Sequence, residues 1–328
     1  MKEKTAVIGG GAWGTALASL MAESGRPVEI YAIEDDVVTA INSSHENKVF
    51  LPGIILNDSV KAKQMDALNK CDTGHIVWTV PTQFSRATAR RYKDALSGRN
   101  ILNASKGIEI ETGKLVISTL KDEIDAEFSI LSGPSFASVV AQKKPTAVSL
   151  GSRNIEIANW WQNQICTDYF RIYTSTDIIG LEVGGALKNV IAVATGISDG
   201  LNMDHNARAV LITRGLAEIT RFGVAYGAKH ETFTGLSGLG DLVLTATGDN
   251  SRNRQAGLSL AKGATLEEIT GKQKSVAEGI FTAKAVHIAS QKINISMPIC
   301  TEVYKIVYEG KKASQSVWDL MHRPLTTE

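Results

Sequence analysis

The sequence has few cysteines and almost no excess charge. Cys71, Cys166 and Cys300 are odd in number, far apart and in no metal-ligand spacing. We therefore interpret them as buried or incidental thiols, and we expect no disulfide, no metal site and no cysteine nucleophile. The formal net charge is +1, from 35 basic and 34 acidic residues, which excludes a general attraction to nucleic acid or to an anionic membrane. Any anion that the chain binds must be recognised by a local site.

Long hydrophobic runs are also lacking. No apolar stretch approaches the roughly 20 residues that a membrane-spanning helix needs. A strand pattern begins at Lys4, which leaves no room for a signal peptide. We therefore expect a cytoplasmic protein without membrane insertion. With 328 residues, 43% of them hydrophobic, the chain is long enough for two domains with a core each.

The first half of the chain alternates short apolar runs with helical stretches, which is typical of βαβ units. The runs predicted as strands span residues 5–8, 28–32, 76–80, 100–104, 128–131, 146–150 and 169–173. From about Asp177 the strand signal fades. Helical patterns over 185–195, 206–226 and 275–292 predict an all-α second part, which a helix beginning near residues 175–185 joins to the first.

The stretch AVIGGGAWGTALA, from Ala6 to Ala18, contains the spacing Gly9-x-Gly11-x-x-Gly14. Such glycines let a backbone turn tightly, approach a pyrophosphate and pack a helix against a strand. The turn follows a predicted strand and leads into a helical pattern over 13–24, which is the context that the motif requires. The predicted fold is therefore α/β, with a Rossmann-type, mostly parallel sheet that binds a dinucleotide in residues 1–180. An all-α, substrate-binding domain follows in residues 181–328.

Candidate binding residues follow five of the predicted strands. Ligands of an open parallel sheet bind outside the carboxyl ends of its strands. The candidates in chain order are the Gly9–Gly14 turn, Glu34, Pro81, Lys106 and the run Gly133-Pro134-Ser135. Each alone could belong to an ordinary loop, but five in succession favour a ligand site.

The predicted helical domain carries an isolated lysine, Lys188, in the apolar segment LEVGGALKNVIAVATGISDG. It either extends to water or is desolvated, and desolvation lowers the pKa of an ammonium towards the range useful for proton transfer. Asp241, in GLGDL, is either a helix cap or a carboxylate that orients a lysine or a substrate hydroxyl. The run Ser251-Arg252-Asn253 suits a phosphate dianion, although Ser251 could equally cap a solvated helix.

Several motifs together resemble one known family. In order along the chain they are GGGAWGTALA, VPT, ASKGIE, SGPSFA, PTAVSL, GGALKNVIAVATGISDG, NARAVLITRGLAEI, GLGDLVLTATGDNSRNR and VAEG. In order and approximate spacing they resemble the soluble, NAD(P)-dependent glycerol-3-phosphate dehydrogenases of bacteria, over essentially the whole chain. The resemblance implies an oxidoreductase that interconverts dihydroxyacetone phosphate and sn-glycerol 3-phosphate, the precursor of glycerophospholipids, and that forms a homodimer.

The resemblance also implies roles for individual residues. Lys188 would be the general acid and base. The substrate would contact Lys106, Gly133, Ser135, Lys188, Asp241, Ser251, Arg252 and Asn253. The cofactor would contact Gly9, Gly11, Ala12, Trp13, Gly14, Glu34, Lys106, Ala137, Arg252, Val276 and Glu278.

Two departures from the family pattern concern the cofactor. Ala12 stands where the family often has Ser, so backbone N–H groups must bind the phosphate there. Ile33 and Glu34 stand where many relatives have Arg or His, and a carboxylate about 20 residues beyond the glycine turn usually accepts the ribose hydroxyls of NAD. We therefore expect NADH to serve at least as well as NADPH. Two alternatives are a dehydrogenase acting on a β-hydroxyacid, which has no need of the phosphate site, and a non-catalytic dinucleotide sensor.

Overall fold

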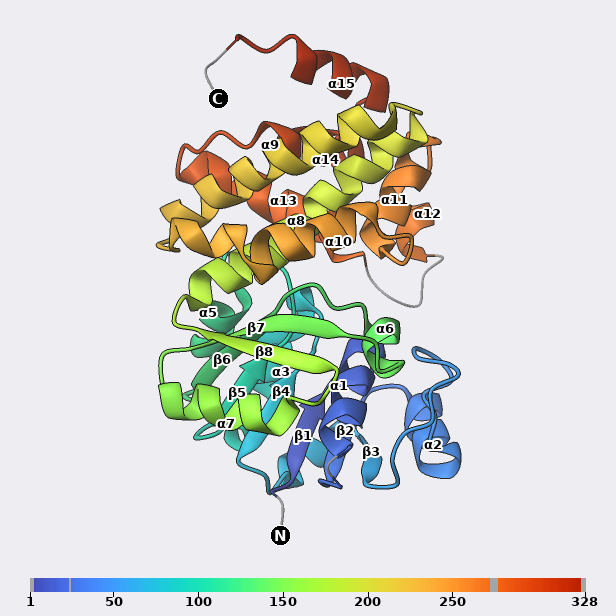
Figure 1. Ribbon diagram of the computed structural model, residues 1–328, viewed down its shortest axis with the longest axis vertical. Helices are drawn as coiled ribbons and strands as arrows, with labels where there is room; N and C mark the ends of the chain where they lie inside the picture. The colour runs from blue at the N-terminus through green and yellow to red at the C-terminus, as the bar shows by residue number, and fades with distance from the viewer. Residues whose placement is uncertain (1–2, 24, 272–276, 326–328) are drawn as a thin grey trace. The chain divides into compact units, whose positions relative to one another are not determined.

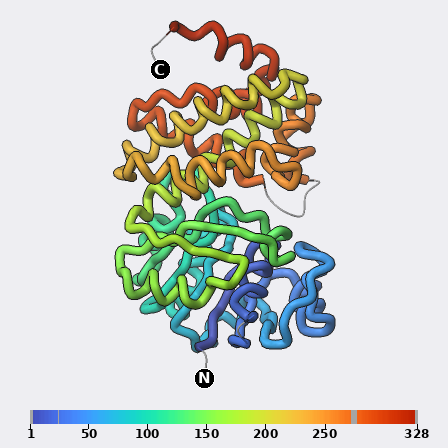
Figure 2. The backbone as a smooth tube through the Cα atoms, in the orientation of Figure 1, coloured from blue at the N-terminus to red at the C-terminus, as the bar shows by residue number. Residues whose placement is uncertain are grey.

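The computed structural model describes residues 3–23, 25–271 and 277–325. The chain forms two compact units, which can be followed by colour in Figures 1 and 2. Unit 1 comprises residues 1–106 and 115–182, and unit 2 comprises residues 107–114 and 183–328. The short segment 107–114 thus groups with the C-terminal half, although it lies between two strands of the N-terminal half.

Unit 1 is built on an eight-stranded sheet with the order β3-β2-β1-β4-β5-β6-β7-β8. The strands are β1 (Thr5–Ile8), β2 (Val28–Ala32), β3 (Val60–Gln64), β4 (His75–Trp78), β5 (Asn100–Asn103), β6 (Glu127–Ser132), β7 (Thr146–Ser152) and β8 (Phe170–Ser175). Neighbouring strands run parallel, with β6 and β7 paired antiparallel. The order reverses at β1, which lies between β2 and β4, as in a doubly wound sheet. The predicted mostly parallel sheet is confirmed.

Alternation along each strand places side chains in two cores, one on each face of the sheet. Val7 and Val77 belong to one core, whereas Ile8, Ile76 and Trp78 belong to the other. Successive side chains of a strand point to opposite faces, so a strand covered on both sides is apolar throughout. Unit 1 also contains α1 (Ala12–Ala22), α2 (Asp35–Ser44), α3 (Ser85–Arg91), α4 (Lys93–Leu96), α5 (Val116–Lys121), α6 (Ala137–Ala141) and α7 (Ile155–Ile165).

Unit 2 is helical in the part of the chain that the structure describes. Its helices are α8 (Ile178–Gly200), α9 (Asp204–Ala225), α10 (Asp241–Thr247), α11 (Arg252–Ala261), α12 (Leu266–Gly271), α13 (Glu278–Lys292), α14 (Pro298–Tyr308) and α15 (Ala313–Met321). Two short helices, η3 (His230–Thr234) and η4 (Leu236–Gly240), precede α10. The start of α8 at Ile178 agrees with the predicted helical junction.

The central helix α8 corrects one expectation from the sequence. It has 23 residues, and an 18-residue window within it has a mean hydropathy of 1.5, so the helix is long and apolar enough to cross a membrane by length and composition alone. However, 83% of this apolar window is buried inside the protein, as in the core helix of a folded domain.

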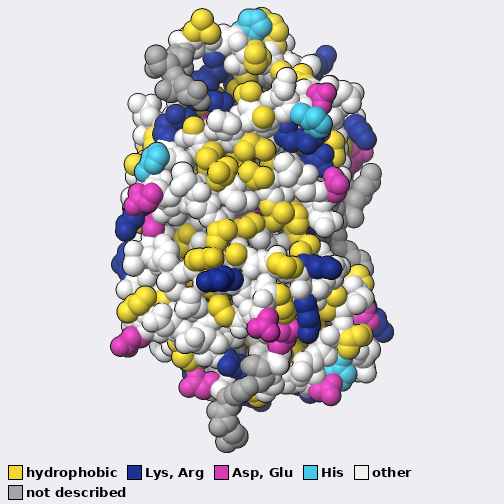
Figure 3. Space-filling view, viewed as in Figure 1, with side chains coloured by type: hydrophobic (Ala, Val, Ile, Leu, Met, Phe, Trp, Pro, Cys, Tyr) yellow, Lys and Arg dark blue, Asp and Glu magenta, His cyan; other side chains and the backbone are white. Residues whose placement is uncertain are grey.

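The surface in Figure 3 carries basic and acidic side chains side by side, which agrees with the near-zero net charge.

Candidate active site

The glycine turn after β1 has a backbone that other residues cannot adopt. Gly9 has a φ of +112°, and a Cβ atom there would lie 2.7 Å from the Oγ1 of Thr79. A Cβ on Gly14 would overlap the carbonyl oxygen of Gly9. The turn is tied to both neighbouring strands, because Gly9 N–H donates to Tyr31 O and Thr79 N–H donates to Ile8 O, each at 2.9 Å. The glycines therefore fix the turn at the point where the strand order reverses.

The first turn of α1 leaves room for an anion. Gly11 is the N-cap, no side chain caps the helix, and no acidic residue lies in its first turn. A Cβ on Gly11 would meet nothing within 4 Å. The buried indole Nε1 of Trp13, in this turn, has no hydrogen-bond partner among the residues that the structure describes. Unpaired N–H groups at a helix N-terminus attract phosphate, so these residues fit the pyrophosphate of a dinucleotide.

The end of β2 is acidic and solvent-exposed. Glu34 is the N-cap of α2, and Asp35 and Asp36 are the first two residues of that helix. Ile33 beside them is 74% exposed and offers no charge. Three carboxylates in succession repel an additional phosphate, whereas each can accept a hydrogen bond from a hydroxyl group.

The loops after β5 and β6 bring together three of the predicted substrate residues. The Nζ of Lys106 and the hydroxyl of Ser135 both donate to the carbonyl oxygen of Gly133, at 3.3 and 3.1 Å. Gly133 has a φ of +147°, and a Cβ there would lie 2.9 Å from the Cα of Val148. The carbonyl thus orients the ammonium of Lys106 at the carboxyl edge of the sheet. Ala137, a predicted cofactor contact, begins α6 close by in the chain.

Lys188 is buried in unit 2 and bound to polar partners. Only 7% of the residue is exposed. Its Nζ forms an ion pair with the Oδ1 of Asp241 and donates to the hydroxyl of Thr245 at 2.9 Å. Asp241, the first residue of α10, is fully buried and therefore orients the lysine rather than capping a solvated helix. The sequence left two interpretations of Lys188, extension to water or desolvation. Because the residue is buried, extension to water is wrong.

Thr245 was not predicted from the sequence. Its hydroxyl donates to the carbonyl oxygen of Asp241 at 2.6 Å, which leaves its lone pairs to accept from Lys188. Residues four apart on a helix share a face. The spacing of Asp241 and Thr245 in GLGDLVLTATG therefore indicates that the two side chains lie next to each other.

The start of α11 contains the residues predicted to hold a phosphate. Ser251 caps the helix, because its hydroxyl accepts from Arg254 N–H at 3.2 Å. The side chain of Asn253 is buried, where it donates to the Oδ1 of Asn189 and accepts from Gly279 N–H, each at 2.9 Å. Asn189 is the neighbour of Lys188 on α8. The hydrogen bond between Asn253 and Asn189 therefore connects the start of α11 to the segment of α8 that carries the buried lysine.

Arg252 differs from its neighbours because it is exposed. The pKa of its guanidinium is lowered, because neighbouring protein atoms remove part of its hydration. The carboxylate of Glu278 acts in the opposite direction, so Glu278 lies close enough to interact with this charge. An arginine remains charged under these conditions and can bind a phosphate through two parallel hydrogen bonds. Val276, another predicted cofactor contact, lies outside the described residues.

A doubly wound sheet with a glycine turn at its switch point, followed in the chain by a helical unit with a buried lysine, defines the class of two-domain, dinucleotide-dependent dehydrogenases. Family models for the N-terminus and the C-terminus of NAD-dependent glycerol-3-phosphate dehydrogenase match residues 4–158 and 177–318. The chain belongs to this family.

Similar proteins agree with this assignment. A glycerol-3-phosphate dehydrogenase [NAD(P)+] of Solidesulfovibrio magneticus is 47% identical over 329 residues, which cover 99% of this chain and all of that protein. One of Desulfotalea psychrophila is 46% identical and covers 98% of both chains. The crystal structure of glycerol-3-phosphate dehydrogenase from Coxiella burnetii matches with a TM-score of 0.94 and 36% identity, over 98% of this chain and 99% of that one. D-mandelate dehydrogenase, with 11% identity and a TM-score of 0.63, shares the fold alone.

Proposed function

We propose that the chain catalyses reversible hydride transfer between NAD(P)H and dihydroxyacetone phosphate, with sn-glycerol 3-phosphate as the product. The observation that carries this proposal is the buried Lys188, bound to Asp241 and Thr245, in a member of the glycerol-3-phosphate dehydrogenase family. The bound nicotinamide supplies the hydride, which the protein's own side chains cannot provide.

Lys188 holds the proton that the reaction needs. Reduction of the C2 carbonyl develops negative charge on its oxygen, and an ammonium in hydrogen-bond reach stabilises that charge and protonates the alkoxide. Asp241 and Thr245 restrict the ammonium to one direction, since each binds Nζ from α10. Lys106, with Gly133 and Ser135, contacts the hydroxyl end of the substrate.

The phosphate of the substrate binds at the start of α11. Arg252 supplies the charge, and Ser251 and Asn253 shape the first turn from which it projects. Asn253 has one amide hydrogen beyond the one donated to Asn189, so it can also contact the phosphate. A fixed phosphate gives a small substrate one orientation.

The dinucleotide is held by the first turn of α1 and by residues of the later loops. The proposed contacts are Gly9, Gly11, Ala12, Trp13, Gly14, Glu34, Lys106, Ala137, Arg252, Val276 and Glu278. NADH serves at least as well as NADPH, because Glu34 accepts the ribose hydroxyls. The family resemblance also supports a cytoplasmic homodimer that supplies glycerophospholipid synthesis.

The experiment that tests this function compares the purified chain with its Arg252→Ala variant. Wild type should oxidise NADH with dihydroxyacetone phosphate and discriminate strongly against unphosphorylated dihydroxyacetone. The variant should raise the KM for the phosphorylated ketone about ten- to a hundredfold, as expected for loss of a charge-assisted contact. It should also lose some affinity for NADH.

Arg153→Ala, which removes an exposed arginine of unit 1, is the matched control and should behave as wild type. No turnover of either ketone by wild type would favour a dinucleotide sensor. Turnover of β-hydroxyacids instead would favour the alternative class of dehydrogenase. Unchanged discrimination in Arg252→Ala would move the phosphate site elsewhere, with Lys106 the next candidate.

A further inference from the structure

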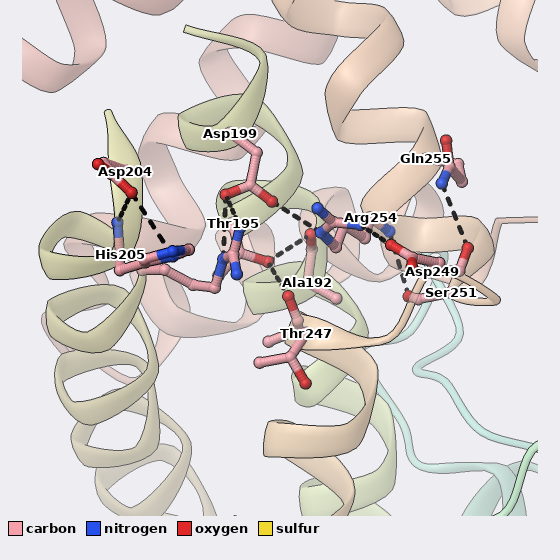
Figure 4. A network of polar contacts seen from close by, with 12 residues as sticks. Ala192, Thr195, Asp199, Asp204, His205, Thr247, Asp249, Ser251, Arg254 and Gln255 are labelled. Carbon is pink, nitrogen blue, oxygen red and sulfur yellow. Dashed lines mark hydrogen bonds and ion pairs between the residues drawn. The ribbon is translucent and has the colours of Figure 1, made fainter. Parts of the chain in front are cut away.

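A buried carboxylate near the end of α8 binds two arginines from two other helices. Asp199 Oδ1 accepts from the Nε and Nη2 of Arg208 on α9, at 3.0 and 2.7 Å. Its Oδ2 accepts from the Nε of Arg254 on α11 at 2.7 Å. Figure 4 shows this network, and only 7% of the Asp199 side chain is exposed. Buried, paired charges of this kind hold their partners in one geometry.

Arg254 lies in the first turn of α11, two residues after Arg252. Its backbone N–H donates to the hydroxyl of the N-cap Ser251, and its Nη1 binds the exposed Asp249 at 3.0 Å. A Cβ on Gly196 of α8 would overlap the carbonyl oxygen of Arg254, so the two helices touch backbone to backbone here. The position of Arg254 therefore determines the position of the whole first turn.

The segment that leads into α11 is held by α8 at its other end as well. The hydroxyl of Thr195 shares its proton between the carbonyl oxygen of Ala192 at 2.9 Å and that of Ala246 at 3.2 Å. Thr195 and Asp199 are four residues apart and share one face of α8. The segment 247–251 is thus fixed at both ends by the helix that also carries Lys188.

The two arginines of the first turn have different environments. The guanidinium of Arg254 is bound by two carboxylates, whereas Arg252 is exposed and its side chain forms no hydrogen bond among the residues that the structure describes. We propose that Asp199 is a positioning residue for the phosphate site: by holding Arg254, it fixes the turn from which Arg252 reaches the substrate phosphate and keeps Arg254 from competing for it. The inference rests on the proposed function, because it takes Arg252 as the phosphate contact.

The test measures Asp199→Ala with four probes: dihydroxyacetone phosphate, inorganic phosphate, NADH and unphosphorylated dihydroxyacetone. The KM for dihydroxyacetone phosphate should rise about tenfold, since a small misplacement of a binding group can cost up to a hundredfold. The inhibition constant of inorganic phosphate, competing with that substrate, should rise by a similar factor. The kcat/KM for unphosphorylated dihydroxyacetone should stay within about twofold of wild type, because that ketone carries no phosphate. The KM for NADH should rise by a smaller factor than the KM for dihydroxyacetone phosphate, because Arg252 is also a proposed cofactor contact.

Asp249→Ala is the matched control, because Asp249 binds the same arginine but its side chain is 94% exposed. Exposed ion pairs contribute little, so this variant should leave the values for all four probes within about twofold of wild type. Asp199→Asn removes the charge without a change in side-chain volume, and we expect the same effects as for Asp199→Ala. It is measured in place of Asp199→Ala if the alanine variant does not fold.

The outcomes separate this inference from the proposed function. If Arg252→Ala abolishes the preference for the phosphorylated ketone and the Asp199 variants do not weaken it, Asp199 has no positioning role and the function stands. An equal loss on both ketones would show that Asp199 serves only stability, which also overturns the inference. If Arg252→Ala itself leaves the preference unchanged, the proposed phosphate site and the inference both fail.

Discussion

The Nζ of Lys188 lies 2.9 Å from the hydroxyl of Thr245, which in turn donates to the carbonyl oxygen of Asp241 at 2.6 Å. The threonine proton is therefore directed away from the lysine, and the hydroxyl can only accept from the ammonium. Together with the Asp241 carboxylate, this arrangement compensates the burial of a charged group, which would otherwise cost several kcal/mol.

Lys188→Ala should remove nearly all turnover and leave the affinity for NADH close to that of wild type. A general acid contributes roughly 10²–10⁴-fold in rate, and the glycine turn does not depend on this side chain. Steady-state kinetics and fluorescence titration with NADH measure the two effects. Lys262→Ala, at an exposed lysine of the same unit, is the control. If the Lys188 variant keeps more than about a tenth of the wild-type kcat, the lysine is structural.

Gly11→Ala and Gly14→Ala should separate cofactor binding from folding. The extra methyl group on Gly11 meets no protein atom within 4 Å, so the free energy of unfolding should change by less than about 1 kcal/mol. It occupies the space where the pyrophosphate approaches, so the Kd for NADH should rise at least about tenfold, or 1.4 kcal/mol.

The methyl group on Gly14 would instead overlap the carbonyl of Gly9 and destabilise unit 1 by about 1–3 kcal/mol. Urea unfolding and NADH titration distinguish the two variants. Wild-type affinity in Gly11→Ala would show that the dinucleotide does not approach this turn.

The kcat/KM for NADH should equal or exceed that for NADPH. Glu34 can accept the ribose hydroxyls of NADH, and it repels a 2′-phosphate together with Asp35 and Asp36. A basic residue that bound the 2′-phosphate would reverse this preference, and Arg86 and Lys48 are the two candidates. Arg86 is engaged by Asp122 and Glu123 at 2.9 and 2.8 Å, and Lys48 is exposed.

Glu34→Gln should lower the ratio of the kcat/KM for NADH to the kcat/KM for NADPH. The control Glu156→Gln, at an exposed glutamate, should leave this ratio unchanged. A kcat/KM for NADPH more than about tenfold above that for NADH, a difference of 1.4 kcal/mol, would show that Glu34 does not govern the choice.

The sequence predicted the sheet well where strands are covered on both faces. The strand β1 is buried throughout and β4 is buried from Ile76 to Trp78, so both appear as short apolar runs. The strand β3, with the sequence VKAKQ, was missed because two lysines interrupt its apolar residues, and Lys61 is exposed. The helix α8 extends beyond the predicted 185–195 at both ends, because flanking apolar residues such as Ile178 and Ile197 also pack in cores.

The candidate site was less predictable, because its partners are far apart in the chain. Lys188 and Asp241 are 53 residues apart, and no local pattern pairs them. Each residue was singled out from its own segment, Lys188 as an isolated lysine among apolar residues and Asp241 as either a helix cap or an orienting carboxylate, and only the family resemblance assigned both to one site. Ser251 illustrates the opposite case, since the local interpretation as a helix cap is confirmed. The roles of these residues towards substrate and cofactor stay predictions.

The buried carboxylate of Glu182 makes the stability of unit 1 dependent on pH. Glu182 Oε1 accepts from Ile117 N–H at 2.9 Å and from the Nδ2 of Asn103 at 3.4 Å. Burial raises the pKa of Glu182 from 4.5 to about 7, although these hydrogen bonds and the charge of Lys121 act in the opposite direction. The folded protein therefore favours the neutral acid, whereas the unfolded chain ionises near its ordinary pKa.

The sign of the effect follows from linkage. Wild type has the full benefit of the neutral acid below about pH 4.5 and loses it as pH rises to about 7, which corresponds to about 3 kcal/mol. Glu182→Gln keeps the accepting oxygen and cannot ionise. From pH 5 to pH 8 the free energy of unfolding of the variant, relative to wild type, should therefore rise by about 2–3 kcal/mol.

Urea unfolding of wild type and variant at both pH values measures this difference. The free energy of unfolding is taken from the first transition. The exposed Glu127→Gln in the same unit is the control, and its difference from wild type should stay constant across the two pH values. A Glu182→Gln difference that does not change between pH 5 and pH 8 would show that the carboxyl is ionised in the folded protein and stabilised by its donors. A difference that falls as pH rises would show that the folded state favours the carboxylate over the acid.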